Sequence, residues 1–208
     1  MRGGDMRMRM HPMHHHLALV LLCSSWLPLC VTEVVADTDD AIWEALQAGG
    51  KVLLLRHARI ERDEGSADPR VRDPSCRAEA KLSAQGRQDA AELGRRFRAQ
   101  QVPVSRVRHS PYCRTVDTAV IAFTQASPAA FLSLIEGLPP DAAAEQTAQL
   151  RQVISAYAED GVLILVTHRP NIAAVSFELL GHLDALVLAP DGAGGFDELG
   201  VLRFSSSD

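Results

Sequence analysis

The chain has 208 residues, of which 47% are hydrophobic and 5% aromatic, and its formal net charge is −5. This length suffices for one α/β domain, and so few aromatic side chains argue against a stacking platform for single-stranded nucleic acid. The three arginines, one aspartate and one glutamate of residues 1–36 leave 18 basic and 24 acidic residues in 37–208. An acidic body disfavours nucleic acid, so any anion site must be a local cluster of positive groups.

Residues 1–36 are interpreted as a signal peptide that is removed. Three arginines precede an apolar run over residues 17–29, and Val34–Ala36 fits a small-residue cleavage site. The run is short and interrupted for a transmembrane span, although an uncleaved anchor is the alternative. We therefore expect a periplasmic or secreted domain of residues 37–208 with no stable membrane span.

Strands and helices alternate along the rest of the chain. Helices are predicted from Thr38, from Ser83, from Ser110-Pro111 (with Ser110 as N-cap) to Phe123, over Ala142–Tyr157 and over Pro170–Leu180. Strands are predicted at Lys51–Leu55, Val104–His109, Phe131–Leu134 and Val162–Val166, with an antiparallel edge pair at Leu186–Leu188 and Val201–Phe204. This order indicates an α/β fold, a three-layer α/β/α sandwich with a mostly parallel sheet.

Two of these strands end in strongly polar side chains. One apolar strand runs directly into Arg56 and His57, and another ends at His168. Because ligands of α/β sheets bind beyond the carboxyl ends of the strands, these groups should share one crevice. Arg114, in the first turn of its helix, could present both its guanidinium and free helix amides to an anion there. The alternatives are a solvated pair at 56–57, an ion pair of Arg114 with Asp117, and a core histidine at 168.

The chemistry of such a cluster suits phosphate. Two guanidiniums match the planar, multi-oxygen geometry of a phosphoryl group. A histidine beside them is either a further donor or a nucleophile that splits one displacement into two easier steps. Phosphoryl transfer requires chiefly positioning and charge stabilisation, which fixed cations supply.

The polar residues belong to four ordered motifs. They are Leu55-Arg-His-Ala58, Leu82-Ser-x-x-Gly86-Arg87, Ser110-Pro-x-x-Arg114-x-x-x-Thr118-Ala119 and Val166-Thr-His168. Their order and spacing over about residues 51–180 resemble the histidine phosphatase superfamily, which has the phosphoglycerate mutase-like fold. The chain looks most like small bacterial members, including exported ones. It departs from the family pattern at Ala58, where a glycine is usual.

The resemblance implies a metal-independent phosphatase that works through a phosphohistidine intermediate, with no cofactor. His57 would be the nucleophile, neutral, with a backbone carbonyl on its other ring nitrogen fixing the tautomer. Arg56 and Arg114 would bind phosphoryl oxygens. His168 would be the second histidine of the pocket, donating to a phosphoryl oxygen.

The proton donor and the substrate are left open. Glu136 is the first candidate for the acid and Asp141 the second, and the alternative is that no dedicated acid exists, which would suit phosphohistidine. The expected partners are phosphomonoesters or phosphohistidine, on a small molecule or a phosphoprotein, and not nucleic acid. A phosphoglycerate mutase-type phosphotransferase and a non-catalytic exported phosphate-binding module are the alternative functions.

Four further residues have chemistry that the motifs do not use. Cys76 and Cys113 remain after removal of residues 1–36 and could form one disulfide in an oxidising compartment. Two buried free thiols are the alternative, because sequence does not give the Cα separation that a bridge needs. His109 and His182 are interpreted as structural or surface residues.

Overall fold

The structure is a computed structural model that describes residues 38–61 and 67–204. The predicted signal peptide, residues 1–36, and its cleavage site lie outside the described residues. Within these two ranges, no helix has the length and apolar character needed to cross a membrane.

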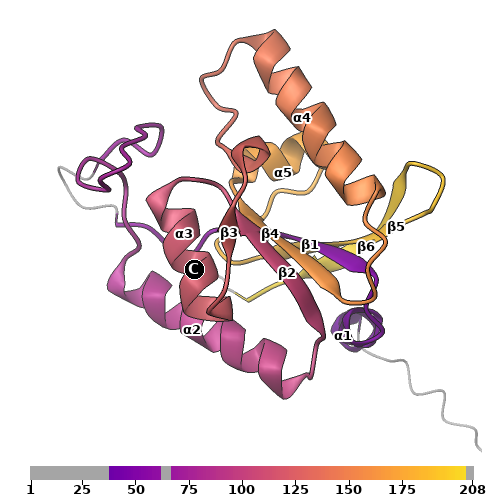
Figure 1. Ribbon diagram of the computed structural model, residues 1–208. Coiled ribbons are helices and arrows are strands. Elements are labelled where there is room, and N and C mark those ends of the chain that lie inside the picture. The colour runs from indigo at the N-terminus through magenta and orange to yellow at the C-terminus, as the bar shows by residue number, and fades with distance from the viewer. Residues whose placement is uncertain (1–37, 62–66, 205–208) are drawn as a thin grey trace, which may run out of the picture. The chain divides into compact units, whose positions relative to one another are not determined.

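A six-stranded sheet occupies the centre of the fold (Figure 1). The strands are β1 (Lys51–Arg56), β2 (Val104–His109), β3 (Ser127–Pro128), β4 (Val162–Thr167), β5 (Ala185–Pro190) and β6 (Phe196–Leu202). Their order is β3-β2-β4-β1-β5-β6, with parallel pairing from β3 to β1 and antiparallel pairing of β5 with both neighbours. The prediction of a mostly parallel sheet is confirmed.

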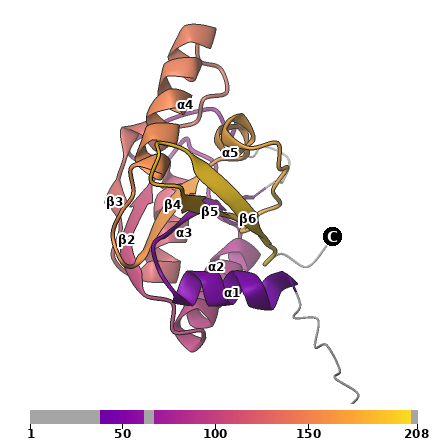
Figure 2. The same cartoon turned by 90° about the vertical axis from the view of Figure 1, so that its right-hand side faces the viewer.

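Helices cover both faces of this sheet. They are α1 (Thr38–Gln47), α2 (Ala84–Ala99), α3 (Cys113–Phe123), α4 (Pro140–Ser155) and α5 (Arg169–Val175). Leu53 and Leu55 of β1 join the core that includes α1, α2 and α3, whereas Val52 and Leu54 join the core that includes α4 and α5. Figures 1 and 2 both show these two groups of helices on opposite sides of the sheet. The three-layer architecture is therefore as predicted, and strands buried on both faces read as continuous apolar runs.

The second strand of the edge pair, predicted at Val201–Phe204, spans Phe196–Leu202, and two other predicted elements differ more clearly from the structure. The strand expected at Phe131–Leu134 is wrong, since a short 3-10 helix, η1 (Ala130–Leu132), lies there and β3 precedes it. Phe131 and Leu132 of η1 pack into the core. An apolar run as short as this one does not distinguish a strand from a buried helical turn. The helix expected over Pro170–Leu180 ends at Val175. Phe177 and Leu179, which extended the apolar pattern, are both exposed.

The serine and glycine of the second motif fix the start of α2, at the position predicted for a helix beginning from Ser83. Ser83 Oγ accepts a hydrogen bond from the Gly86 amide at 3.0 Å, which caps the helix. A Cβ atom added to Gly86 would lie 2.2 Å from the carbonyl oxygen of Arg59, so only glycine allows this approach. The Ser83 amide also donates to that carbonyl at 3.0 Å. These contacts hold the chain that follows β1 against α2.

Candidate active site

The ends of β1 and β4 carry the polar groups of the site. These strands are parallel neighbours, and Arg56 pairs in register with Thr167. His57 and His168 follow the two strands, and their ring centroids lie 5.5 Å apart. Arg114 of α3 contacts both rings, with Nε 3.2 Å from His57 Nε2 and Nη2 3.1 Å from His168 Nδ1. The parallel register therefore brings together side chains that are more than 50 residues apart in sequence.

Hydrogen bonds define the tautomer of His57. Its Nδ1 lies 2.8 Å from the carbonyl oxygen of Ala58, so Nδ1 carries the proton and donates. Its Nε2 accepts from Arg114, because a guanidinium can only donate. Burial, followed by the charges of His168 and Arg114, holds the pKa of His57 well below its ordinary value. His57 is therefore neutral at neutral pH, and its unprotonated Nε2 accepts the hydrogen bond from Arg114.

Thr118 ties this arrangement to α3. Its hydroxyl accepts from the Ala58 amide at 3.0 Å and donates to the Arg114 carbonyl at 2.7 Å. The side chain is fully buried. One hydroxyl thus couples the residue after His57 to the helix that carries Arg114, which explains the threonine of the third motif.

Both ring nitrogens of His168 are also engaged. Nδ1 accepts from Arg114, so the proton lies on Nε2, which donates to Ser110 Oγ at 2.8 Å. Burial, followed by the charges of Arg114 and Arg56, lowers the pKa of His168 well below its ordinary value. With both histidines neutral, the positive charge of the site comes from guanidiniums: those of Arg56 and Arg114, and that of Arg169 in the cavity lining.

The prediction that Ser110 caps α3 is wrong. The helix starts at Cys113 with Tyr112 as N-cap, and the Ser110 hydroxyl bonds to His168 instead. The Cys113 amide donates to Glu79 Oε2 at 2.7 Å, so this amide does not face an anion in the site as expected. A carboxylate at the positive end of the helix dipole takes that place.

A cavity of about 210 Å³ opens over these groups. The residues lining it are Arg56, His57, Ile60, Pro69, Arg114, Leu134, Glu136, His168, Arg169, Pro170 and His182. Nη1 of Arg114 is buried and, within the part of the chain that the structure describes, has no hydrogen-bond partner. Leaving a buried charged donor unpaired is costly, and an anion in this cavity would supply the acceptor. A larger cavity of about 490 Å³, lined by residues of α2, β2 and α3, contains no histidine or carboxylate.

The two candidate acids differ in position. Glu136 is exposed and lines the cavity, whereas Asp141 lies in the first turn of α4 and does not. Buried Asn171 holds the segment before Glu136, donating to the Ser133 carbonyl at 2.6 Å and accepting from the Ile135 amide at 3.3 Å. Of the two carboxylates, Glu136 is thus the one that lies at the cavity.

The sequence patterns do not predict a place for His182 in the site. His182, interpreted as structural or surface, lines the cavity. Its position follows from the antiparallel pairing of β5 with β1, in which Leu55 lies opposite Ala185. The residues just before β5 are thereby brought to the edge where β1 ends. Sequence patterns do not reveal which strand lies beside β1, so they carried no signal for His182.

A disulfide fixes one wall of the cavity. Cys76 and Cys113 are bridged, with a Cα–Cα distance of 5.9 Å, which decides between the two alternatives left open by the sequence. We call residues 67–80 the strap. The strap contributes Pro69 to the cavity wall, and the bridge attaches it to the residue directly before Arg114.

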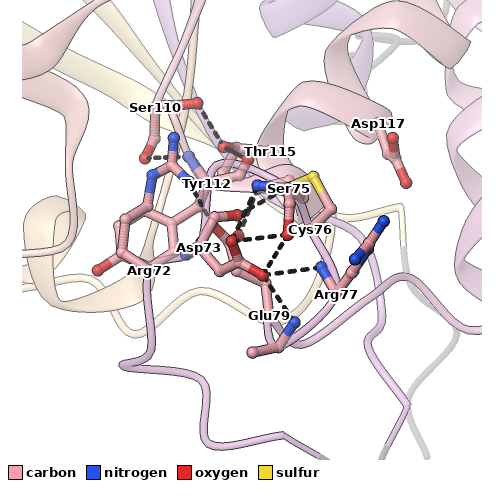
Figure 3. The surroundings of a disulfide bond; sticks show 12 residues. Arg72, Asp73, Ser75, Cys76, Arg77, Glu79, Ser110, Tyr112, Thr115 and Asp117 are labelled. Atoms are coloured by element: carbon pink, nitrogen blue, oxygen red, sulfur yellow. Dashed lines mark hydrogen bonds and ion pairs between the residues drawn. A yellow bond between two sulfur atoms is a disulfide. The ribbon is translucent and has the colours of Figure 1, made fainter.

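A buried carboxylate reinforces the strap beside the disulfide. Glu79, whose side chain is fully buried, accepts from Arg72 Nη1 at 2.6 Å, from the Asp73 amide at 2.9 Å and from the Cys113 amide. Figure 3 shows Arg72, Asp73 and Glu79 gathered around Cys76. The strap is thus joined to the start of α3 by the disulfide and by Glu79, which accepts hydrogen bonds from both segments.

Comparison with known proteins agrees with this description. Residues 52–138 match the model of the histidine phosphatase superfamily (branch 1), a range that includes Arg56, His57 and Arg114. A search of curated protein sequences finds no match.

Solved structures share the fold. SixA, a protein histidine phosphatase complexed with tungstate, has a TM-score of 0.53 at 14% identity, covering 74% of this chain and 97% of that one. YhfR from Bacillus stearothermophilus has a TM-score of 0.54 at 18% identity, covering 71% and 94%. The phosphoserine phosphatase of Entamoeba histolytica, in complex with 3-phosphoglyceric acid, has a TM-score of 0.52 at 16% identity, covering 74% and 96%. The chain shares the fold of these solved structures, and its match to the histidine phosphatase superfamily (branch 1) extends over residues 52–138, which hold the first three motifs.

Proposed function

We propose that the protein is a metal-independent phosphatase that hydrolyses phosphomonoesters or phosphohistidine through a phosphohistidine intermediate on His57. One observation carries the proposal. His57 and Arg114 line one small cavity together with Arg56 and His168, and Arg114 has a buried Nη1 that lacks a hydrogen-bond partner among the described residues. A nucleophile beside fixed cations is what phosphoryl transfer requires.

In the first step, the phosphoryl group replaces His57 as the acceptor of the Arg114 hydrogen bond. Nε2 of His57 attacks phosphorus and forms a P–N bond, while the bond from phosphorus to the leaving group breaks. The electron pair of that bond goes to the leaving group. When the leaving group is an alkoxide, it takes a proton from Glu136. In the second step, water deprotonated by the Glu136 carboxylate attacks phosphorus. The P–N bond breaks, which restores the lone pair of His57 and releases inorganic phosphate.

His168 changes its hydrogen bonding in this scheme. Its Nδ1 is an acceptor in the free protein, because Arg114 donates to it. A nearby dianion favours the charged form of a histidine, so a bound phosphoryl group raises the pKa of His168. Protonated at Nδ1, the ring can donate to a phosphoryl oxygen while Nε2 stays bonded to Ser110.

The need for Glu136 depends on the leaving group. An alkyl phosphomonoester has a poor leaving group and requires an acid, whereas p-nitrophenyl phosphate and phosphohistidine do not. Glu136→Gln should therefore lose at least about tenfold in kcat on an alkyl phosphomonoester and much less on p-nitrophenyl phosphate. Asp141→Asn is the matched control and should leave both rates unchanged. Equal losses on the two substrates would remove Glu136 as the acid.

Hydrolysis of p-nitrophenyl phosphate tests the proposal itself. The wild type should release p-nitrophenol, and His57→Ala should abolish release while its thermal unfolding curve stays cooperative. Retained activity in His57→Ala would remove this residue as the nucleophile. Phosphate binding without any turnover by the wild type would instead favour a binding module.

We also propose that the protein works in the periplasm or outside the cell, after removal of residues 1–36. The disulfide supports this location, since such bonds persist in oxidising compartments. Mass spectrometry of the exported protein should find Asp37 at its amino terminus. An intact leader would point to an anchored protein.

A further inference from the structure

A third imidazole lies beside the nucleophile. The ring centroid of His182 is 5.4 Å from that of His57. Its Nδ1 lies 3.2 Å from the carbonyl oxygen of His57, and its Nε2 lies 3.3 Å from Arg56 Nη2. One side chain thus bridges the backbone of one site residue and the guanidinium of another.

The chemistry of the two contacts permits one tautomer. A guanidinium has no acceptor, so Arg56 donates and Nε2 of His182 carries no proton. A carbonyl oxygen has no donor, so Nδ1 of His182 carries the proton and donates to His57. The neutral Nδ1–H tautomer satisfies both bonds at once, and a side chain without an acceptor at the Nε2 position loses the bond to Arg56.

The turn that carries His182 also forms hydrogen bonds with Arg56 through its backbone. Arg56 Nη1 donates to the Leu180 carbonyl at 2.7 Å, and the Arg56 amide donates to the Asp184 carbonyl at 3.1 Å. Residues 180–184 therefore contact Arg56 through a backbone carbonyl at each end and through His182 between them.

This turn is held in an unfavourable backbone conformation. Leu183, which is buried, has a φ of +64°, a region that branched side chains rarely adopt. The buried carboxylate of Asp184 stabilises it, accepting from the Gly181 amide at 2.9 Å and from Arg203 Nη1 at 3.2 Å. Strain of this kind persists where the surrounding contacts determine the conformation, and it clusters at ligand sites. The contacts of Asp184 thus constrain the backbone of the turn that carries His182.

We propose that His182 is a positioning residue that holds the Arg56 guanidinium toward the phosphoryl group in the cavity. The inference rests on the proposed function, in which Arg56 binds phosphoryl oxygens. An arginine side chain loses conformational entropy when it binds a ligand. A guanidinium that is already held in place loses less of this entropy, so binding is tighter. His182 therefore acts on phosphate affinity through Arg56, to which its Nε2 is bonded, and its Nδ1 bonds to the backbone of His57 and not to the Nε2 that attacks phosphorus.

A double-mutant cycle tests this inference with two readouts: the Kd for inorganic phosphate by calorimetry, and kcat and KM for p-nitrophenyl phosphate. His182→Ala should weaken phosphate binding and raise KM about tenfold, with kcat within about threefold, as expected for loss of a hydrogen bond to a charged group. In an Arg56→Ala background the same change should alter the phosphate Kd less than about twofold. Equal effects in the two backgrounds, or no effect in the wild type, would overturn the inference.

A matched pair of variants covers a failure of His182→Ala to fold. The amide oxygen of His182→Gln can take the place of Nε2 as acceptor for Arg56, whereas that of His182→Asn is too short to reach it. Glutamine should keep phosphate affinity within about threefold of the wild type, and asparagine should not. The reverse order contradicts the role. Because phosphate binding needs no turnover, a wild type that binds phosphate without hydrolysing substrate refutes the proposed function and still leaves His182 testable.

Discussion

Removing the disulfide between Cys76 and Cys113 should destabilise the folded protein by about 4 kcal/mol. The bridge joins residues separated by 37 positions, and closing a loop of that length removes this much conformational entropy from the unfolded chain. For a domain of this size, the loss corresponds to a fall in Tm of about 10 °C. The double variant Cys76→Ala/Cys113→Ala is the suitable change, because it keeps the Cys113 amide that donates to Glu79.

Urea unfolding followed by circular dichroism measures this loss. The wild type is compared with the double variant, each with and without dithiothreitol. Dithiothreitol should lower the unfolding free energy of the wild type toward that of the variant and leave the variant unchanged. Because the strap brings Pro69 to the cavity wall, KM for p-nitrophenyl phosphate should rise as the strap is released. A difference below about 0.5 kcal/mol between wild type and variant would refute the reasoning, since surface changes of no consequence fall in that range.

Three other expectations follow from the site. Arg114→Ala should lose about 10²–10³-fold in kcat/KM, and Arg114→Lys should recover little of it, because lysine cannot reproduce a planar fork that reaches both histidines. EDTA should leave the rate unchanged, and a loss that added metal restores would contradict a mechanism based on fixed cations. The lowered pKa values of His57 and His168 make folding depend on pH, because the unfolded chain binds more protons below about pH 6.5. The free energy of unfolding should therefore fall between pH 7.5 and 5.5, by up to about 1.4 kcal/mol for each histidine, and His57→Ala should reduce this dependence. Urea titrations at the two pH values check it, and equal stabilities at both would contradict neutral, buried rings.

The sequence predicted the part of the site that follows from strand order. Arg56, His57 and His168 come directly after apolar strands, and the carboxyl ends of parallel strands meet at one edge of the sheet. Local pattern and general topology were therefore sufficient to bring these groups together.

Residues placed by long-range contacts could not be predicted in this way. His182 reaches the cavity because β5 pairs antiparallel with β1, a pairing that its neighbours in sequence do not encode. Ser110 looked like a helix cap because the local sequence favours one, but a buried imidazole competes for its hydroxyl. The Cys113 amide donates to Glu79, which lies 34 residues away in the chain. In each case a tertiary partner overrides the local preference.

Trapping the covalent intermediate tests the central claim most directly. The protein is mixed with p-nitrophenyl phosphate, quenched in alkali, digested and analysed by mass spectrometry. We predict a phosphoryl group on His57 that is stable in alkali and lost in acid, and that is absent from His57→Ala. An acid-stable adduct, or a phosphoryl group on another residue, would contradict the account.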